Sequence, residues 1–103
     1  MEQELIIKFW RQPLPDQATM ASVSAELTSV LGTTAELDGY DVKGEELNLF
    51  VKTDDPKQAF RRIKKVLESC GITEGFSAAY RLIGGAQFTS LWPPRATRKF
   101  KLP

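Results

Sequence analysis

A strand that passes directly into a capped helix, over residues 47–71, constrains the fold of this chain more than any other feature. Its first part repeats apolar side chains every second residue, which is the period of a strand with two different faces. Its second part repeats them at helical spacing, after an Asp-Asp-Pro sequence that suits a helix start. The apolar positions are Leu47, Leu49 and Val51 in the strand, and Ala59, Phe60, Ile63, Val66, Leu67 and Cys70 in the helix. Gly71 then predicts the end of the helix.

The first third of the chain repeats this arrangement. Leu5, Ile7 and Phe9 alternate with other side chains and predict a strand. A helix is expected to begin at Asp16, which can accept a hydrogen bond from an unpaired N–H group of the first turn, and to end at Gly32. The two halves therefore predict the same strand-and-helix unit.

Further strands are expected between and after the helices. The predicted strands cover residues 5–11, 34–42, 47–53, 76–83 and 86–92, with a kink at Gly39, a turn at Gly44 and a tight hairpin at the Gly84-Gly85 pair. This order predicts an α+β fold, a ferredoxin-like βαββαβ sandwich with an added C-terminal hairpin strand and two helices on one face of an antiparallel sheet. Right-handed crossovers give the sheet order 4-1-3-2, with the added strand beside the fourth.

The composition is that of one ordinary globular domain. Hydrophobic residues make up 42% and charged residues 26% of the 103 residues, a balance typical of a packed core. Cys70 is the only cysteine, so no internal disulfide can form and a reducing compartment is favoured. The cytoplasm is therefore the expected location. No run of residues is long and apolar enough to span a bilayer, so we expect no membrane partner.

The last nine residues are basic. Arg95, Arg98, Lys99 and Lys101 are four of the fourteen cations, which leaves ten cations against thirteen acids in the rest of the chain. We divide the chain into a single ferredoxin-like domain, residues 1–94, and a basic C-terminal tail, residues 95–103. Such a tail is either a solvated terminus or a contact for nucleic acid or an acidic protein surface.

The sheet face that the helices leave uncovered is the candidate binding site. If the apolar positions named above face the helices, strict alternation sends the side chains between them to this open face. The expected binding residues, on the open face or at its edge, are Lys8, Trp10, Phe50, Lys52, Tyr80, Arg81 and Trp92. Large exposed apolar surfaces usually mark an interface. We expect cover by a partner or a second copy, and the alternative is cover by the domain's own tail, through Trp92 and Phe100.

Three functions are compatible with such a face. The first is a non-catalytic cytoplasmic module that binds an unknown protein, or itself as a homodimer, through the open face and the fifth strand. The second is a small-molecule site or enzyme like the dimeric αβ barrels, with a pocket bounded by Trp10, Phe50 and Tyr80. The third is binding of single-stranded nucleic acid, with rings stacked on bases and cations beside phosphates. The basic, Gly, aromatic, Gly, aromatic sequence of an RNA-recognition motif is absent around Phe50. We therefore rank binding of nucleic acid below binding of a protein.

Catalytic and metal sites find little support in the sequence. The chain contains no histidine, the commonest general base and a frequent metal ligand. The adjacent Asp54 and Asp55 are explained by the helix start, and the acids of residues 36–46 lack the spacing of a calcium loop. We therefore expect no catalytic residue, no metal and no cofactor, and the balance is against an enzyme.

Three short segments and the opening of the chain form a recognisable combination. They are Asn-Leu-Phe-Val-Lys-Thr-Asp-Asp-Pro at 48–56, Ala-Tyr-Arg at 79–81, Phe-Thr-Ser-Leu-Trp-Pro-Pro at 88–94, and Phe-Trp-Arg-Gln-Pro-Leu-Pro at 9–15. Together they resemble a group of small uncharacterised bacterial proteins, over nearly the whole chain. The resemblance implies no activity, cofactor or site, but it draws attention to Trp10, Arg81 and Trp92.

Overall fold

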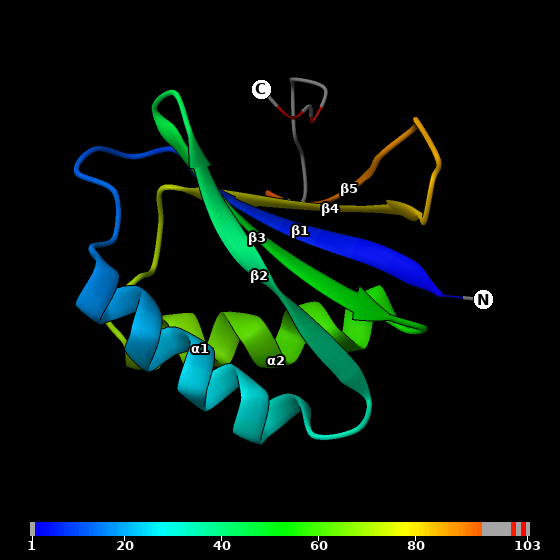
Figure 1. Cartoon of the computed structure of the whole chain (residues 1–103), viewed down its shortest axis with the longest axis horizontal. Coiled ribbons are helices and arrows are strands. Elements are labelled where there is room, and N and C mark those ends of the chain that lie inside the picture. Colours follow the sequence, from blue (N-terminus) through cyan, green and yellow to red (C-terminus); the bar gives the residue numbers. More distant parts are fainter. Residues whose placement is uncertain (1, 94–99, 101, 103) are drawn as a thin grey trace.

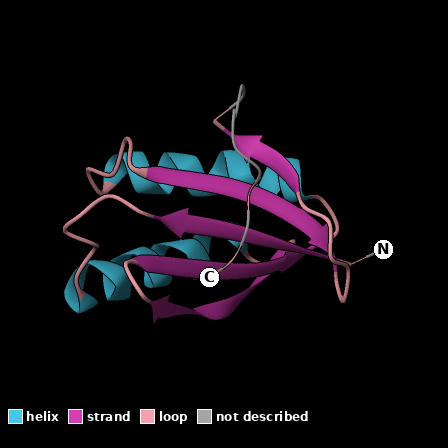
Figure 2. Ribbon diagram, turned by 90° about the horizontal axis from the view of Figure 1, so that it is seen from above, coloured by secondary structure: helices cyan, strands magenta, loops and turns pink. Residues whose placement is uncertain are grey.

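Seven elements follow one another in the computed structural model, which describes residues 2–93, 100 and 102. They are β1 (Gln3–Phe9), α1 (Gln17–Leu31), β2 (Ala35–Lys43), β3 (Glu46–Thr53), α2 (Pro56–Ser69), β4 (Phe76–Leu82) and β5 (Thr89–Trp92). The strands form one antiparallel sheet in the order β2-β3-β1-β4-β5. Both helices lie on one side of this sheet (Figure 1), and the view in Figure 2 shows the strands side by side over them. The architecture is α+β and compatible with a ferredoxin-like fold.

The helices are capped by the residues that the sequence indicated. The Oδ1 atom of Asp16 accepts a hydrogen bond of 2.8 Å from the backbone N–H of Thr19 at the start of α1. The Oδ1 atom of Asp55 does the same for Gln58 at the start of α2, at 3.1 Å. Each bond satisfies one of the N–H groups that a helix start leaves unpaired. The predicted helix boundaries are therefore confirmed to within a residue or two.

The hydrophobic core fills the space between the sheet and the helices. Its strand members alternate along the sheet, and its helix members form one stripe on each helix, so these elements contribute the face that their sequence period predicts. The largest fully buried members include Leu5, Ile7, Phe9, Met20, Leu27, Leu31, Leu47, Leu49, Ile63 and Leu67. The opposite face of the sheet receives the remaining strand residues.

The first and fifth strands differ from the prediction: β1 has the predicted length but lies two residues earlier in the chain, and β5 is shorter. The strand predicted over residues 5–11 ends at Phe9, because the backbone N–H groups of Trp10 and Arg11 both donate to the carbonyl oxygen of Gly75, at 3.0 and 3.3 Å. The fifth strand begins at Thr89, not at residue 86, and residues 83–88 form a loop in place of a tight Gly-Gly hairpin. The loop that holds Gly75 and the loop of residues 83–88 lie at opposite ends of β4.

The edge strand β2 carries the expected kink. Its pairing with β3 shifts register between Leu37 and Tyr40, and Gly39 between them has a φ of +99°, which favours glycine. A bulge of this kind, together with the exposed carboxylate side chains of β2, hinders pairing of this sheet edge with another chain.

The predicted basic tail falls mainly outside the described residues. Arg95, Arg98, Lys99 and Lys101 are among the residues that the structure does not describe, whereas Phe100 and Leu102 are described. In the described part, neither helix has the length and apolar character needed to cross a membrane.

Candidate functional site: the open face of the sheet

The alternation of side chains along β1 gives the sheet two differently used faces. Leu5 and Ile7 belong to the core under the helices, whereas Ile6 lies between them and pairs with Phe50 on β3 and with Ala79 on β4. Ile6 and Ala79 are fully buried although neither belongs to the core cluster. The centre of the open face is therefore covered by the chain itself.

Two phenylalanines lie over this central region. Phe88 comes from the loop before β5 and Phe100 from the C-terminal segment, and their ring centroids are 5.1 Å apart at an interplanar angle of 55°. The Nζ atom of Lys8 lies 4.6 Å from the Phe100 centroid, and the guanidinium carbon of Arg81 lies 4.7 Å from the Phe88 centroid. Lys8 and Arg81 alternate with core residues on β1 and β4, which places both rings on the open face. Of Trp92 and Phe100, the two aromatics expected as cover by the tail, Phe100 is the one found there.

The two cations beside these rings are also paired with acids. Lys8 Nζ lies 3.6 Å from Glu46 Oε2, and Arg81 Nη2 lies 2.9 Å from Glu4 Oε1. A continuous row thus crosses the sheet, which we call the aromatic-cation row, and it consists of Glu46, Lys8, Phe100, Phe88, Arg81 and Glu4. Contacts of a cation with a ring and of two rings are each worth about 0.5–1.5 kcal/mol. The row therefore holds the Phe100 ring on the sheet.

Trp10 remains exposed at one end of this face. The residue is 47% exposed, and its indole Nε1–H donates to the hydroxyl oxygen of Ser77 at 3.2 Å. The guanidinium carbon of Arg11 lies 5.8 Å from the indole ring, and Arg11 is itself paired with Glu74. The ring is thus held in position by hydrogen bonds and backbone contacts while much of its surface faces solvent.

Phe50 and Lys52 lie on the open face as expected. Both are half-buried and alternate along β3 with the core residues Leu49 and Val51. Lys52 Nζ lies 3.9 Å from Asp38 Oδ1. Alternation from the core positions therefore placed both side chains correctly.

Tyr80 and Trp92, by contrast, lie on the helix-covered side, so their predicted place on the open face is wrong. Tyr80 packs against the core cluster, as alternation with the open-face residue Ala79 requires. Trp92 pairs with the core residue Ala78, because the register of β5 shifts there by one residue. The indole consequently stacks beside Phe76, with centroids 6.3 Å apart, and also contacts a ring and an ammonium group of α2.

The side chain of Asn48 is a poorly satisfied polar group beside the aromatic-cation row. It is 1% exposed, and its Oδ1 atom has no hydrogen-bond partner among the described residues. Asn48 lies opposite Lys8 on one side and opposite Asp41 on the other, and Asp41 Oδ1 is buried in the same unbonded state within the described part of the chain. Buried acceptors of this kind are uncommon in folded proteins.

Sequence reasoning missed Phe88, Glu4 and Asn48 as members of this face. The sequence predicts a regular strand at Phe88, and nothing in its local pattern indicates that the ring would meet Arg81 and Phe100. Glu4 and Asn48 could have been found, because both alternate with core positions on β1 and β3.

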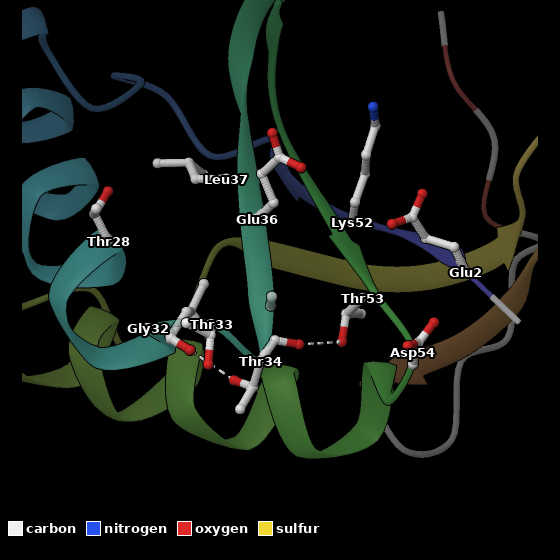
Figure 3. Close-up of a pocket in the computed structure, with 12 residues that line it drawn as sticks. Glu2, Thr28, Gly32, Thr33, Thr34, Glu36, Leu37, Lys52, Thr53 and Asp54 are labelled. Carbon is white, nitrogen blue, oxygen red and sulfur yellow. Dashed lines mark hydrogen bonds between the residues drawn. The ribbon is translucent and has the colours of Figure 1, made fainter.

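A depression of about 540 Å³ lies away from the aromatic-cation row, at the ends of α1 and β3. Figure 3 shows Glu36 and Lys52 on one side of the sheet edge and Thr34 on the other, so the depression wraps around an edge. Two of its hydroxyl groups are engaged: Thr34 Oγ1 donates to Leu31 O at 2.6 Å, and Thr53 Oγ1 donates to Thr34 O at 3.4 Å. These hydroxyl groups serve the fold of the edge rather than a ligand.

A second depression, of about 410 Å³, lies between the loops that flank β1 and β4. Arg11, Cys70 and Glu74 contribute to its walls. The Cys70 thiol lies 3.7 Å from Glu26 Oε2, and Arg11 is paired with Glu74. Within the described residues no group of three or more Asp, Glu or Cys side chains is placed to hold a metal ion.

Comparison of the chain with models of known protein families gives no match, and comparison with curated proteins gives none either.

Proposed function

We propose that this chain is a non-catalytic binding module with a ferredoxin-like fold, and that it binds a protein through the end of the open face that carries Trp10. The observation that carries the proposal is the combination of exposure and fixed position at Trp10. The residue is 47% exposed, yet its indole N–H donates to the Ser77 hydroxyl and its backbone N–H to the Gly75 carbonyl. Tryptophan and arginine side chains dominate the energetics of protein interfaces, and a ring that is already ordered loses little entropy on binding.

The charges of the open face favour a protein over a nucleic acid. Lys8, Lys52 and Arg81 each lie within 4 Å of a carboxylate oxygen, from Glu46, Asp38 and Glu4 respectively. Binding of single-stranded nucleic acid depends on cations that can neutralise phosphates and release counterions. Cations that already have acidic partners on the same face supply little of this effect.

A small-molecule site of the dimeric αβ-barrel kind receives less support. That function requires a pocket bounded by Trp10, Phe50 and Tyr80. Phe50 alternates with core residues whereas Tyr80 packs against the core, so the two side chains lie on opposite sides of the sheet. One pocket on the open face cannot include both.

Site-specific crosslinking tests the proposal for a protein partner of any sequence. Trp10 is replaced by the photoreactive residue p-benzoylphenylalanine, the chain is expressed in its native cells, and one defined adduct is expected by mass spectrometry. The matched control is the same replacement at Val42, which is 57% exposed on the edge strand β2. Sedimentation equilibrium of the wild type shows whether the adduct is a second copy. Absence of an adduct specific to position 10, together with a monomer at all concentrations, would contradict the proposal.

A further inference from the structure

Phe100, three residues before the end of the sequence, lies on the open face in a position that a ligand ring could also occupy. Its ring is tilted against Phe88, with centroids 5.1 Å apart, and the Lys8 ammonium lies 4.6 Å from its centroid. Phe88 is held in turn by the Arg81 guanidinium at 4.7 Å. The position that Phe100 fills is thus built by β1, β4 and the loop before β5, all of which belong to the folded domain.

Ile6 and Ala79 form the apolar centre of the open face, as a cross-strand pair between Lys8 on β1 and Arg81 on β4. Both are fully buried, although the core under the helices contains neither of them. A sheet face with buried apolar residues at its centre needs a covering group, and the paired rings of Phe88 and Phe100 lie on this face.

An acceptor that lacks a donor lies beside the same position. Asn48 is the β3 neighbour of Lys8, and its buried Oδ1 atom has no hydrogen-bond partner in the described part of the chain. A buried acceptor left in this state costs free energy that an N–H donor would recover. The ring of Phe100 therefore fills the aromatic position of the site, and the buried Asn48 Oδ1 beside it is left without a donor in the described part of the chain.

We propose that the open face is a receptor groove for an aromatic-bearing peptide segment of a partner protein, and that Phe100 is its built-in competitor. This inference rests on the proposed function and names the partner's chemistry: an aromatic side chain that packs on Phe88 beside Lys8, next to an N–H donor for Asn48. Binding of the partner displaces Phe100, and Trp10 contacts the partner at the end of the groove. Phe100 lowers the apparent affinity for such a segment, because the segment can bind only to the fraction of molecules whose site is free of Phe100.

The test uses the full chain and a peptide with the sequence of residues 94–103, PRATRKFKLP. A fluorescent form of this peptide is titrated against the wild type and against the Phe100→Ala variant (F100A). We expect the peptide to bind F100A about tenfold more tightly than the wild type, the range expected for loss of one ring pair and one cation contact. A peptide with Phe100→Ala has the same charge and is expected to bind neither protein, which separates ring recognition from attraction of a basic peptide. The V42A variant is the surface control and should behave as the wild type.

Several outcomes would overturn this inference. Equal affinity of the wild type and F100A for the peptide would show that Phe100 does not compete for the groove, as would binding of the alanine peptide. Dimerisation of F100A in peptide-free buffer would assign the groove to a second copy. Should F100A fail to fold by circular dichroism, the F100L variant keeps apolar cover but lacks the ring, and it is expected to give an intermediate gain. Peptide binding by F100A in the absence of any Trp10 adduct would reject the proposed function while leaving the groove assignment standing.

Discussion

The ammonium nitrogen of Lys8 lies 4.6 Å from the centre of the Phe100 ring, although the two residues stand near opposite ends of the chain. Glu46 also approaches this ammonium group, with its Oε2 atom at 3.6 Å. The side chain of Lys8 is only 12% exposed as a result. The contact with Phe100 joins the first strand to this residue and places the ring on the open sheet face.

Replacement of Ile6 by alanine should be costly even though Ile6 lies outside the main core. Its side chain is fully buried, so Ile6→Ala is expected to lower the free energy of unfolding by about 2–4 kcal/mol in urea titrations. Ile83→Ala is the control, because Ile83 is 50% exposed and should cost well under about 1 kcal/mol. Similar small losses for both variants would mean that the open face is not covered.

The two tryptophans should report opposite environments. In the Trp92→Phe variant all indole emission comes from Trp10, and in the Trp10→Phe variant it comes from Trp92. Because Trp92 packs beside Phe60 and Phe76, the Trp10→Phe protein should emit at shorter wavelength and be quenched less by acrylamide than the Trp92→Phe protein. The reverse order of quenching would place Trp92 on the solvent side.

Gly75 should tolerate a methyl group far less than Gly84 does. Both have positive φ angles, +85° and +82°, so alanine is strained by about 1–2 kcal/mol at each. At Gly75 an added Cβ would also lie 2.5 Å from the Cβ of Arg11, whereas Gly84 has open space. Gly75→Ala is therefore expected to cost a further 1–3 kcal/mol, roughly the penalty for overpacking, in urea unfolding. Equal losses at the two positions would contradict this close approach of Arg11.

The stability of the chain should fall at acid pH partly through Asp16. The hydrogen bond from the Thr19 backbone N–H holds the pKa of this carboxyl below its ordinary value of 3.8. A lowered pKa in the folded state gives stability that is present above the unfolded pKa and is lost as pH falls through the folded pKa. The stability difference between the wild type and Asp16→Asn, measured by urea unfolding, should therefore shrink from pH 7 to about pH 3. A difference that stays constant with pH would rule out this linkage.

The helices and the kinked edge strand were predictable because their signals are local. Asp16 and Asp55 accept hydrogen bonds from residues three positions ahead, and Gly39 bends β2 through its own φ angle. Alternation on β1 and β3 also placed Lys8 and Phe50 on the correct face.

The position of Trp92 was not predictable from alternation along β5. One extra residue in this strand moves the Trp92 side chain from the open face of the sheet to the face that the helices cover. The pairing runs from Ala79 with Ser90 to Ala78 with Trp92, and the sequence of this stretch carries no signal for the bulge. Cover of the open face by Phe100 was one of the alternatives that the sequence offered, but the sequence could not decide between it and cover by a partner or a second copy. Cover by Phe100 depends on a contact between Lys8 and Phe100, and sequence periodicity carries no information on pairs so far apart.

The solvent accessibility of the Ile6 methyl group tests most directly whether the chain covers its own open face. Paramagnetic relaxation by a soluble probe, measured by methyl NMR, gives this accessibility, and Ile7 (fully buried) and Ile83 (50% exposed) serve as internal references. In the wild type Ile6 should be protected like Ile7, and in Phe100→Ala it should move toward Ile83. An Ile6 methyl as accessible as that of Ile83 in the wild type, or one unchanged by Phe100→Ala, would contradict the account.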